Sequence, residues 1–146
     1  VLLHDDDHAT DQFHPQVRVD ALGRVAVSWY DRRVSGPTLP NWEMALFGRV
    51  SQDGGKTFGP LTQIGDVAFP PSQTNPNTGG FSGCYMGDYN GMTGGDSDFL
   101  FGWGDNRDGA PTDPDPNVYF DRALECVPST SQAGKGGGKS SCKVGH

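Results

Sequence analysis

The octapeptide Ser51-Gln52-Asp53-Gly54-Gly55-Lys56-Thr57-Phe58 decides the fold that the sequence predicts. Asp53-Gly54-Gly55 predicts a tight turn, because glycine adopts positive φ without steric cost and aspartate can hydrogen-bond the backbone just after it. The hydroxyls of Ser51 and Thr57 can add bonds that hold the turn, and Phe58 can pack back on a sheet. Since strand-like segments lie on both sides, the octapeptide predicts a hairpin of two antiparallel strands.

Working outward, residues 13–64 contain four strand-like segments around this turn. In one of them, Val25, Val27 and Trp29 alternate with smaller or polar residues, which is typical of a strand with one buried face. We expect the four segments to form one antiparallel sheet. They are Phe13 to Asp20, Arg24 to Asp31, Met44 to Val50 and Phe58 to about Ile64.

The pattern starts again after a loop at 65–88 that is rich in Pro, Gly, Asn and Ser. Trp29-x-Asp31-x-Arg33 reappears 74 residues later as Trp103-x-Asp105-x-Arg107. A repeat of this kind indicates an array of similar sheets. We expect the second sheet within 89–124, without an obvious copy of the octapeptide. Its predicted strands are Tyr89 to Thr93, Phe99 to Trp103 and Asn117 to Ala123.

Composition agrees with an all-β chain and argues against several classes of protein. With 22 Gly and 11 Pro in 146 residues, short strands and turns are favoured over helices. No apolar run approaches the roughly 18 residues of a membrane-spanning helix. The net charge of −7 argues against a nucleic-acid partner, which needs clustered Lys and Arg. Residues 1–12 are expected to be a loop or strand remnant, and the Gly-, Ser- and Lys-rich residues 125–146 a tail.

The octapeptide resembles the Asp-box, or BNR repeat, of sialidase-like β-propellers. DQFHPQVRVDALGRVAVSWYDRR at Asp11 to Arg33 and YMGDYNGM at Tyr85 to Met92, followed by FGWGDNRDG and NVYFDR, are similar to consecutive blades of bacterial proteins of this type. The resemblance implies a β-propeller of four-stranded antiparallel blades on a secreted or cell-surface protein. About two blades of a six-bladed ring are present. The partners implied are therefore missing blades outside this chain, or identical protomers.

In a propeller, the turns between the first and second strands and between the third and fourth strands share one face. The other loops share the opposite face, where we expect any site. Repetition of the Asp and Arg of Trp-x-Asp-x-Arg favours a structural role, in which they pair with each other or cap loop amides at strand ends. Trp29 and Trp103 are expected to pack between blades. The candidate ligand-binding residues on this face are Asp31, Arg33, Trp42, Tyr85 and Asp105. The catalytic candidates are Asp88, Tyr89 and Arg107.

The catalytic residues of sialidases cannot be transferred to this chain. The Arg-Ile-Pro motif of the family is absent, and neither glutamate, Glu43 or Glu125, has the context of the partner of a tyrosine nucleophile. The sequence therefore favours a binding or structural module that presents loops to glycans or proteins. One alternative is part of a sialidase-type exo-glycosidase whose other residues lie on missing blades. Another is a trimeric lectin of two-blade protomers.

Two further features carry weaker predictions. Asp5, Asp6 and Asp7 could bind Ca²⁺ through their carboxylates, or could lie in a solvated loop, and no cofactor is otherwise expected. A disulfide between Cys126 and Cys142 would pin the tail in an oxidising compartment. Cys84 could pair with either of them, or all three cysteines could be free thiols.

Overall fold

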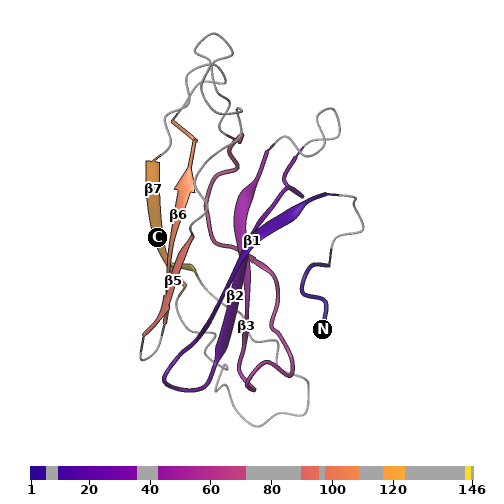
Figure 1. The fold of residues 1–146 in the computed structure, drawn as a ribbon, viewed down its shortest axis with the longest axis vertical. Helices are drawn as coiled ribbons and strands as arrows, with labels where there is room; N and C mark the ends of the chain where they lie inside the picture. Colours follow the sequence, from indigo (N-terminus) through magenta and orange to yellow (C-terminus); the bar gives the residue numbers. More distant parts are fainter. Residues whose placement is uncertain are drawn as a thin grey trace, which may run out of the picture.

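The computed structural model describes residues 1–5, 10–35, 43–71, 90–95, 98–108, 117–123 and 144–145. These parts of the chain contain β-strands and no helix, which confirms the all-β prediction. The strands form two four-stranded antiparallel sheets, each with its strands in sequence order. Figure 1 shows the two sheets side by side, with the first strands of each sheet near one another.

The first sheet comprises β1 (Gln12–Val19), β2 (Val25–Asp31), β3 (Ala45–Ser51) and β4 (Thr62–Gln63). The second comprises β5 (Gly91–Gly94), β6 (Phe99–Asp105), β7 (Asn117–Ala123) and β8 (Val144–Gly145). The two central pairs have the same register, because Trp29 lies opposite Phe47 as Trp103 lies opposite Tyr119. The 74-residue sequence repeat is therefore also a structural repeat.

Two strands differ from the sequence predictions. β4 is shorter than expected, and Pro60 explains part of this because proline has no N–H to donate to a ladder. The chain before β4 is instead held by a 2.9 Å bond from the Gly59 amide to the Val50 carbonyl. β8 lies in the segment 125–146 that was predicted to be a tail, and it pairs with Arg122 and Ala123 of β7.

The main core lies between the two sheets. Side chains alternate along a strand, so one face of the first sheet presents Ala26, Tyr30 and Leu46 toward the second. The second sheet packs Phe99, Phe101 and Trp103 against them, and each of these is 2–3% exposed. Burial of such aromatic side chains contributes about 2 kcal/mol each to folding. A smaller cluster on the far face of the first sheet has three buried members with Leu3, Val34 and Leu61 packed against them. The three are Trp29, Ala45 and Phe47.

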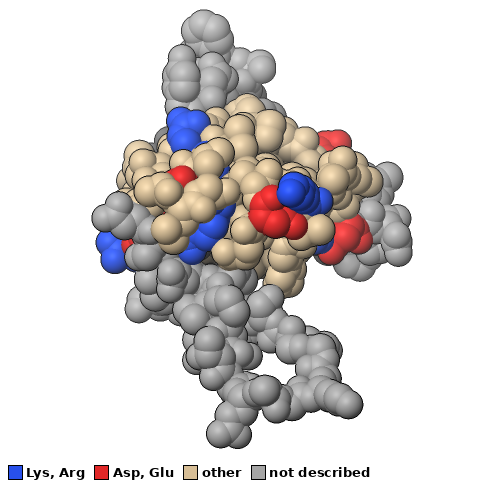
Figure 2. Space-filling view, turned by 90° about the horizontal axis from the view of Figure 1, so that it is seen from below, with Lys and Arg blue, Asp and Glu red and all other residues tan. Residues whose placement is uncertain are grey.

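A close approach of two turns joins the sheets at one end. Asp20, in the β1–β2 turn, accepts 2.9 and 2.5 Å bonds from the amide and Nε of Arg24. The Arg24 guanidinium in turn lies 5.5 Å from the ring centroid of Phe99. Gly94 is needed here, because a Cβ at this position would lie 3.0 Å from the Asp20 Cα. Seen from this end, acidic and basic side chains lie close together on a mostly uncharged surface (Figure 2).

Candidate functional site

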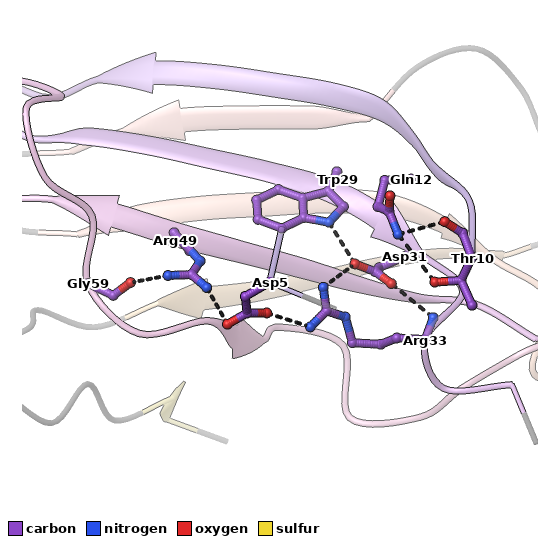
Figure 3. Close-up of polar contacts among 8 residues, drawn as sticks. All are labelled: Asp5, Thr10, Gln12, Trp29, Asp31, Arg33, Arg49 and Gly59. Atoms are coloured by element: carbon purple, nitrogen blue, oxygen red, sulfur yellow. Dashed lines mark hydrogen bonds and ion pairs between the residues drawn. The ribbon is translucent and has the colours of Figure 1, made fainter. Parts of the chain in front are cut away.

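The Trp-x-Asp-x-Arg motif of the first sheet forms a compact clamp at the end of β2. Asp31 is fully buried, and its carboxylate accepts a 2.9 Å bond from the indole Nε1 of Trp29. It also accepts the backbone amide of Arg33 at 2.9 Å and the Arg33 Nη2 at 2.8 Å. Figure 3 shows these bonds converging on the carboxylate. Three donors explain how a charged group is tolerated at a fully buried position.

The second sheet repeats the clamp at the end of β6. Asp105 is also fully buried, and it accepts the Trp103 Nε1 at 3.3 Å and the Arg107 amide at 2.8 Å. Arg107 adds bonds of 2.9 Å from Nε and 2.5 Å from Nη2, both to the Oδ2 oxygen of the carboxylate. The contact with Asp105 is the main cause that raises the pKa of the Arg107 guanidinium. This arrangement is the pairing at a strand end that the repetition of the motif allowed.

Each clamp arginine also reaches a second, half-exposed aspartate, which we call the outer aspartate. Arg33 Nη1 donates to Asp5 at 2.8 Å, and Arg107 Nη1 donates to Asp66 at 2.6 Å. The hydrogen bond from Arg33 is the largest influence on Asp5 and holds the pKa of its carboxyl below the usual value. In both sheets the outer aspartate precedes the first strand of the sheet whose arginine it binds.

The segments that carry the outer aspartates both have an aliphatic residue two positions before the aspartate. Leu3-His4-Asp5 packs Leu3 against the Trp29 cluster, and Ile64-Gly65-Asp66 packs Ile64 in the cluster of Trp103. A Cβ on Gly65 would lie 3.4 Å from the Trp103 ring, which shows how closely this segment approaches the indole. Residues 3–5 therefore have the same position relative to the first sheet as residues 64–66 have relative to the second sheet.

The two clamps differ at one charged position. In the first sheet Arg49 of β3 donates to Asp5 at 2.5 Å and to the Gly59 carbonyl at 3.1 Å, so Asp5 lies between two arginines (Figure 3). Asp121 of β7 occupies the position of Arg49 in the second sheet, because it lies opposite Phe101 as Arg49 lies opposite Val27. This exchange of a cation for an anion changes the local charge by two.

A hollow of about 360 Å³ opens beside the second clamp. Its aromatic wall includes Trp103 and Tyr119, and the Arg107 guanidinium lies 4.0 Å from the centroid of the Tyr119 ring. The Tyr119 hydroxyl donates to Asp108, and this bond is the main cause that raises the pKa of Tyr119 to about 12. The full lining is Ile64, Asp66, Trp103, Arg107, Tyr119, Phe120 and Asp121.

A second hollow, of about 190 Å³ and more apolar, lies beside Trp29. It is bordered by β1 near an irregularity in that strand, where the register shifts between Phe13 and Gln16. His14 within this irregularity has φ of 52°, an uncommon value for a residue with a side chain. The lining residues are Leu3, His4, Gln12, Phe13, Pro15, Val27 and Trp29.

The octapeptide turn is held by side-chain hydrogen bonds. Asp53 accepts the amides of Lys56 and Thr57 at 3.0 and 2.8 Å, and the Thr57 hydroxyl at 2.6 Å. The hydroxyl of Ser51 donates to Asp53 and accepts the Gly55 amide, both at 2.8 Å. Gly54 and Gly55 have φ of 71° and 90°, values that favour glycine. The polar groups named for the turn thus bond one another and the backbone of the turn itself.

Several predicted site residues lie outside the described part of the chain. The described candidates Asp31, Arg33, Asp105 and Arg107 gather in the two clamps. Strand register aligns Asp121 with Arg49, and no sequence motif pointed to Asp121, Asp66 or Tyr119. The predicted residues outside the described ranges are Trp42, Tyr85, Asp88, Tyr89, Asp6, Asp7, Cys84, Cys126 and Cys142.

Metal binding stays a prediction. Within the described residues no three His, Cys, Asp or Glu side chains are grouped as metal ligands. Asp5, the described member of the predicted Ca²⁺ cluster, directs its two oxygens at Arg33 and Arg49. The described segments also contain no helix with the length and apolarity to cross a membrane.

Comparisons of the chain with known protein families, with curated proteins and with solved structures find no match.

Proposed function

We propose that this chain is a glycan-binding module of the Asp-box propeller type, in which two blades present a ligand site beside Arg107. The observation that carries the proposal is the hollow at the second clamp, where an otherwise repeated structure departs from its copy. The octapeptide hairpin and the four-stranded, sequence-ordered sheets support the propeller architecture. Its partners are further blades or identical protomers, and we place it outside the cell.

The lining of the hollow suits a sugar ring. Ligand sites combine apolar or aromatic walls with a few fixed polar groups. Here Trp103 and Tyr119 offer aromatic surface, while Asp66 and Asp121 offer carboxylate oxygens that can accept bonds from hydroxyls. Arg107 is held by Asp105 and Asp66, so its guanidinium has a fixed position in the wall of the hollow, against the ring of Tyr119. These groups favour a neutral sugar over an acidic one, since two carboxylates border the space.

Glycan-array screening followed by calorimetric titration of a bound neutral glycan tests this site. We expect Tyr119→Ala and Asp121→Ala each to weaken binding at least tenfold. Val118→Ala is the matched control, because it alters the same strand on the opposite face of the sheet and should leave affinity unchanged. Failure to bind any neutral glycan, or equal binding by all three variants, would reject the site.

The exo-glycosidase alternative is separated by a direct assay. Release of a fluorogenic group from a sialoside by this chain, and loss of that release in Asp88→Ala, would replace the binding proposal with a catalytic one. We expect no release above that of the Asp88→Ala control. The clamp arginines support this expectation, because their guanidinium groups are already bonded to aspartates of the chain.

A further inference from the structure

Each sheet has two faces that the repeat allows us to compare. We call the side that carries Trp29 or Trp103 the tryptophan face, and the other side the reverse face. The interface inside the molecule joins the tryptophan face of the second sheet to the reverse face of the first. Its contacts include Tyr30 with Gly104 and Arg24 with Phe99.

The tryptophan face of the first sheet is open where its counterpart is covered. Val17 lies opposite Val27 as Met92 lies opposite Phe101, so Val17 and Met92 are equivalent. Met92 is 5% exposed at the internal interface, whereas Val17 is 54% exposed. Val19, which is equivalent to Gly94, is 61% exposed. An apolar side chain is thus exposed on this face at the position where the second sheet buries Met92.

The reverse face of the second sheet is open in the same way. Val118 lies opposite Gly104 as Leu46 lies opposite Tyr30, so Val118 and Leu46 are equivalent. Leu46 is 1% exposed, but Val118 is 87% exposed. Phe120, on the same face, is 65% exposed. Exposed valine and phenylalanine on one sheet face are a feature of surfaces that bind a partner.

We propose that a second copy of this chain covers these faces, with the reverse face of the second sheet of one copy packed on the tryptophan face of the first sheet of the next. The internal interface supports this pairing, because it joins a tryptophan face to a reverse face. The open tryptophan face of the first sheet and the open reverse face of the second sheet are the repeat equivalents of those two faces. One chain carries both open faces, so copies can associate head to tail. The proposal rests on the propeller-type arrangement proposed above, and does not depend on the glycan site.

Light scattering of two single variants tests the head-to-tail geometry. The unmodified chain should have a mass of at least two chains, each of 15.6 kDa. Val17→Lys and Phe120→Lys should each reduce it to one chain, whereas Val67→Lys, an exposed apolar residue outside both faces, should not. A mixture of Val17→Lys and Phe120→Lys should form a dimer, because each chain keeps one intact face. A monomeric unmodified chain, or a mixture that does not associate, overturns the proposal.

A disulfide between two copies tests the proposed contact directly. It does not depend on lysine variants, which could unfold the chain. Inside the molecule a Cβ on Gly94 would lie 3.0 Å from the Asp20 Cα. Between copies the equivalent pair is Val19 with Gly95, the residue after Gly94. A Cβ on Gly95 would lie 2.5 Å from the Asp98 Oδ1 of the same chain, so all variants carry Asp98→Ala. The double variant Val19→Cys/Gly95→Cys should form oxidant-dependent covalent multimers. Either single cysteine variant should form only the multimers that the native cysteines give. Equal multimer formation by all three overturns the proposal, and glycan titration of the same variants reports separately on the ligand site.

Discussion

The hydroxyl of Tyr30 donates a 2.6 Å hydrogen bond to the carbonyl oxygen of Gly104, which is the residue at the equivalent position of the second sheet. Two positions that correspond in the repeat are therefore in contact across the core. The two positions play different parts in this contact, because one contributes a side-chain hydroxyl and the other a backbone carbonyl. Burial is the main cause that raises the pKa of Tyr30, so the phenol is a neutral donor.

Tyr30→Phe should reduce the free energy of unfolding by about 1–3 kcal/mol. The change removes the hydrogen bond and leaves the Gly104 carbonyl without this donor at the interface. Urea denaturation followed by tryptophan fluorescence measures the loss. Tyr119→Phe is the control, since its hydroxyl bonds the exposed Asp108, and it should cost less than about 0.5 kcal/mol. Equal losses in the two variants would show that the contact between sheets has no special weight.

Asp105→Asn should destabilise the protein by about 3 kcal/mol. The substitution removes a buried charge and leaves the Arg107 guanidinium without the carboxylate oxygen that accepts two of its bonds, which is the costly way to break a buried pair. Asp31→Asn should give a similar loss because the first clamp has the same geometry. Thermal or urea unfolding measures both. Asp108→Asn, at an exposed position, serves as the control, and a loss of the same size there would contradict this explanation.

Gly48→Ala should destabilise by about 1–3 kcal/mol, whereas Gly102→Ala should be nearly neutral. A Cβ on Gly48 would lie 2.8 Å from the Val27 carbonyl oxygen and 2.9 Å from the Ile64 Cδ1. The nearest atom to a Cβ on Gly102 is 3.9 Å away, which is an ordinary contact. Both glycines lie within central strands, so strand propensity is similar and unfolding free energies compare the packing directly. A reversed order would refute the packing described between β3 and the end of β4.

Asp53 should make stability depend on pH in the acid range. The hydrogen bond from the Thr57 hydroxyl is the largest of the causes that lower the pKa of Asp53 from its ordinary value of 3.8. A carboxyl with a lowered pKa contributes stability that is present above pH 3.8 and is lost as the pH falls through the folded pKa. Asp53→Asn should therefore flatten the acid limb of a plot of unfolding free energy against pH. An unchanged limb would exclude Asp53 as a contributor.

Much of the fold was predictable because local chemistry determines it. The glycines and hydroxyls of the octapeptide specify a turn, and the alternation of Val25, Val27 and Trp29 specifies a strand with one buried face. The Trp-x-Asp-x-Arg repeat identified the equivalent strand β6. β8 could not be predicted, because Val144 lies in a Gly-rich segment and the strand exists only through its pairing with β7.

The candidate site was predictable only in part, for a different reason. The motif drew attention to Asp31 and Asp105, but their burial depends on donors that fold around them. Asp66 and Tyr119 reach Arg107 from other elements, 41 residues away in the case of Asp66. No local pattern records such distant contacts. Asp121 becomes notable only after strand register aligns it with Arg49.

The bond between Arg107 and Asp66 has a consequence for how the protein unfolds. Asp66 follows β4 of the first sheet, and the arginine that it binds follows β6 of the second. Separation of the sheets would break this ion pair and expose the core between them, where Ile64 packs with Trp103, so partial opening is penalised at the junction. The two sheets should therefore melt as one cooperative unit. Amide hydrogen exchange in β2 and β6 would then proceed through the same global opening, with a single shared opening free energy.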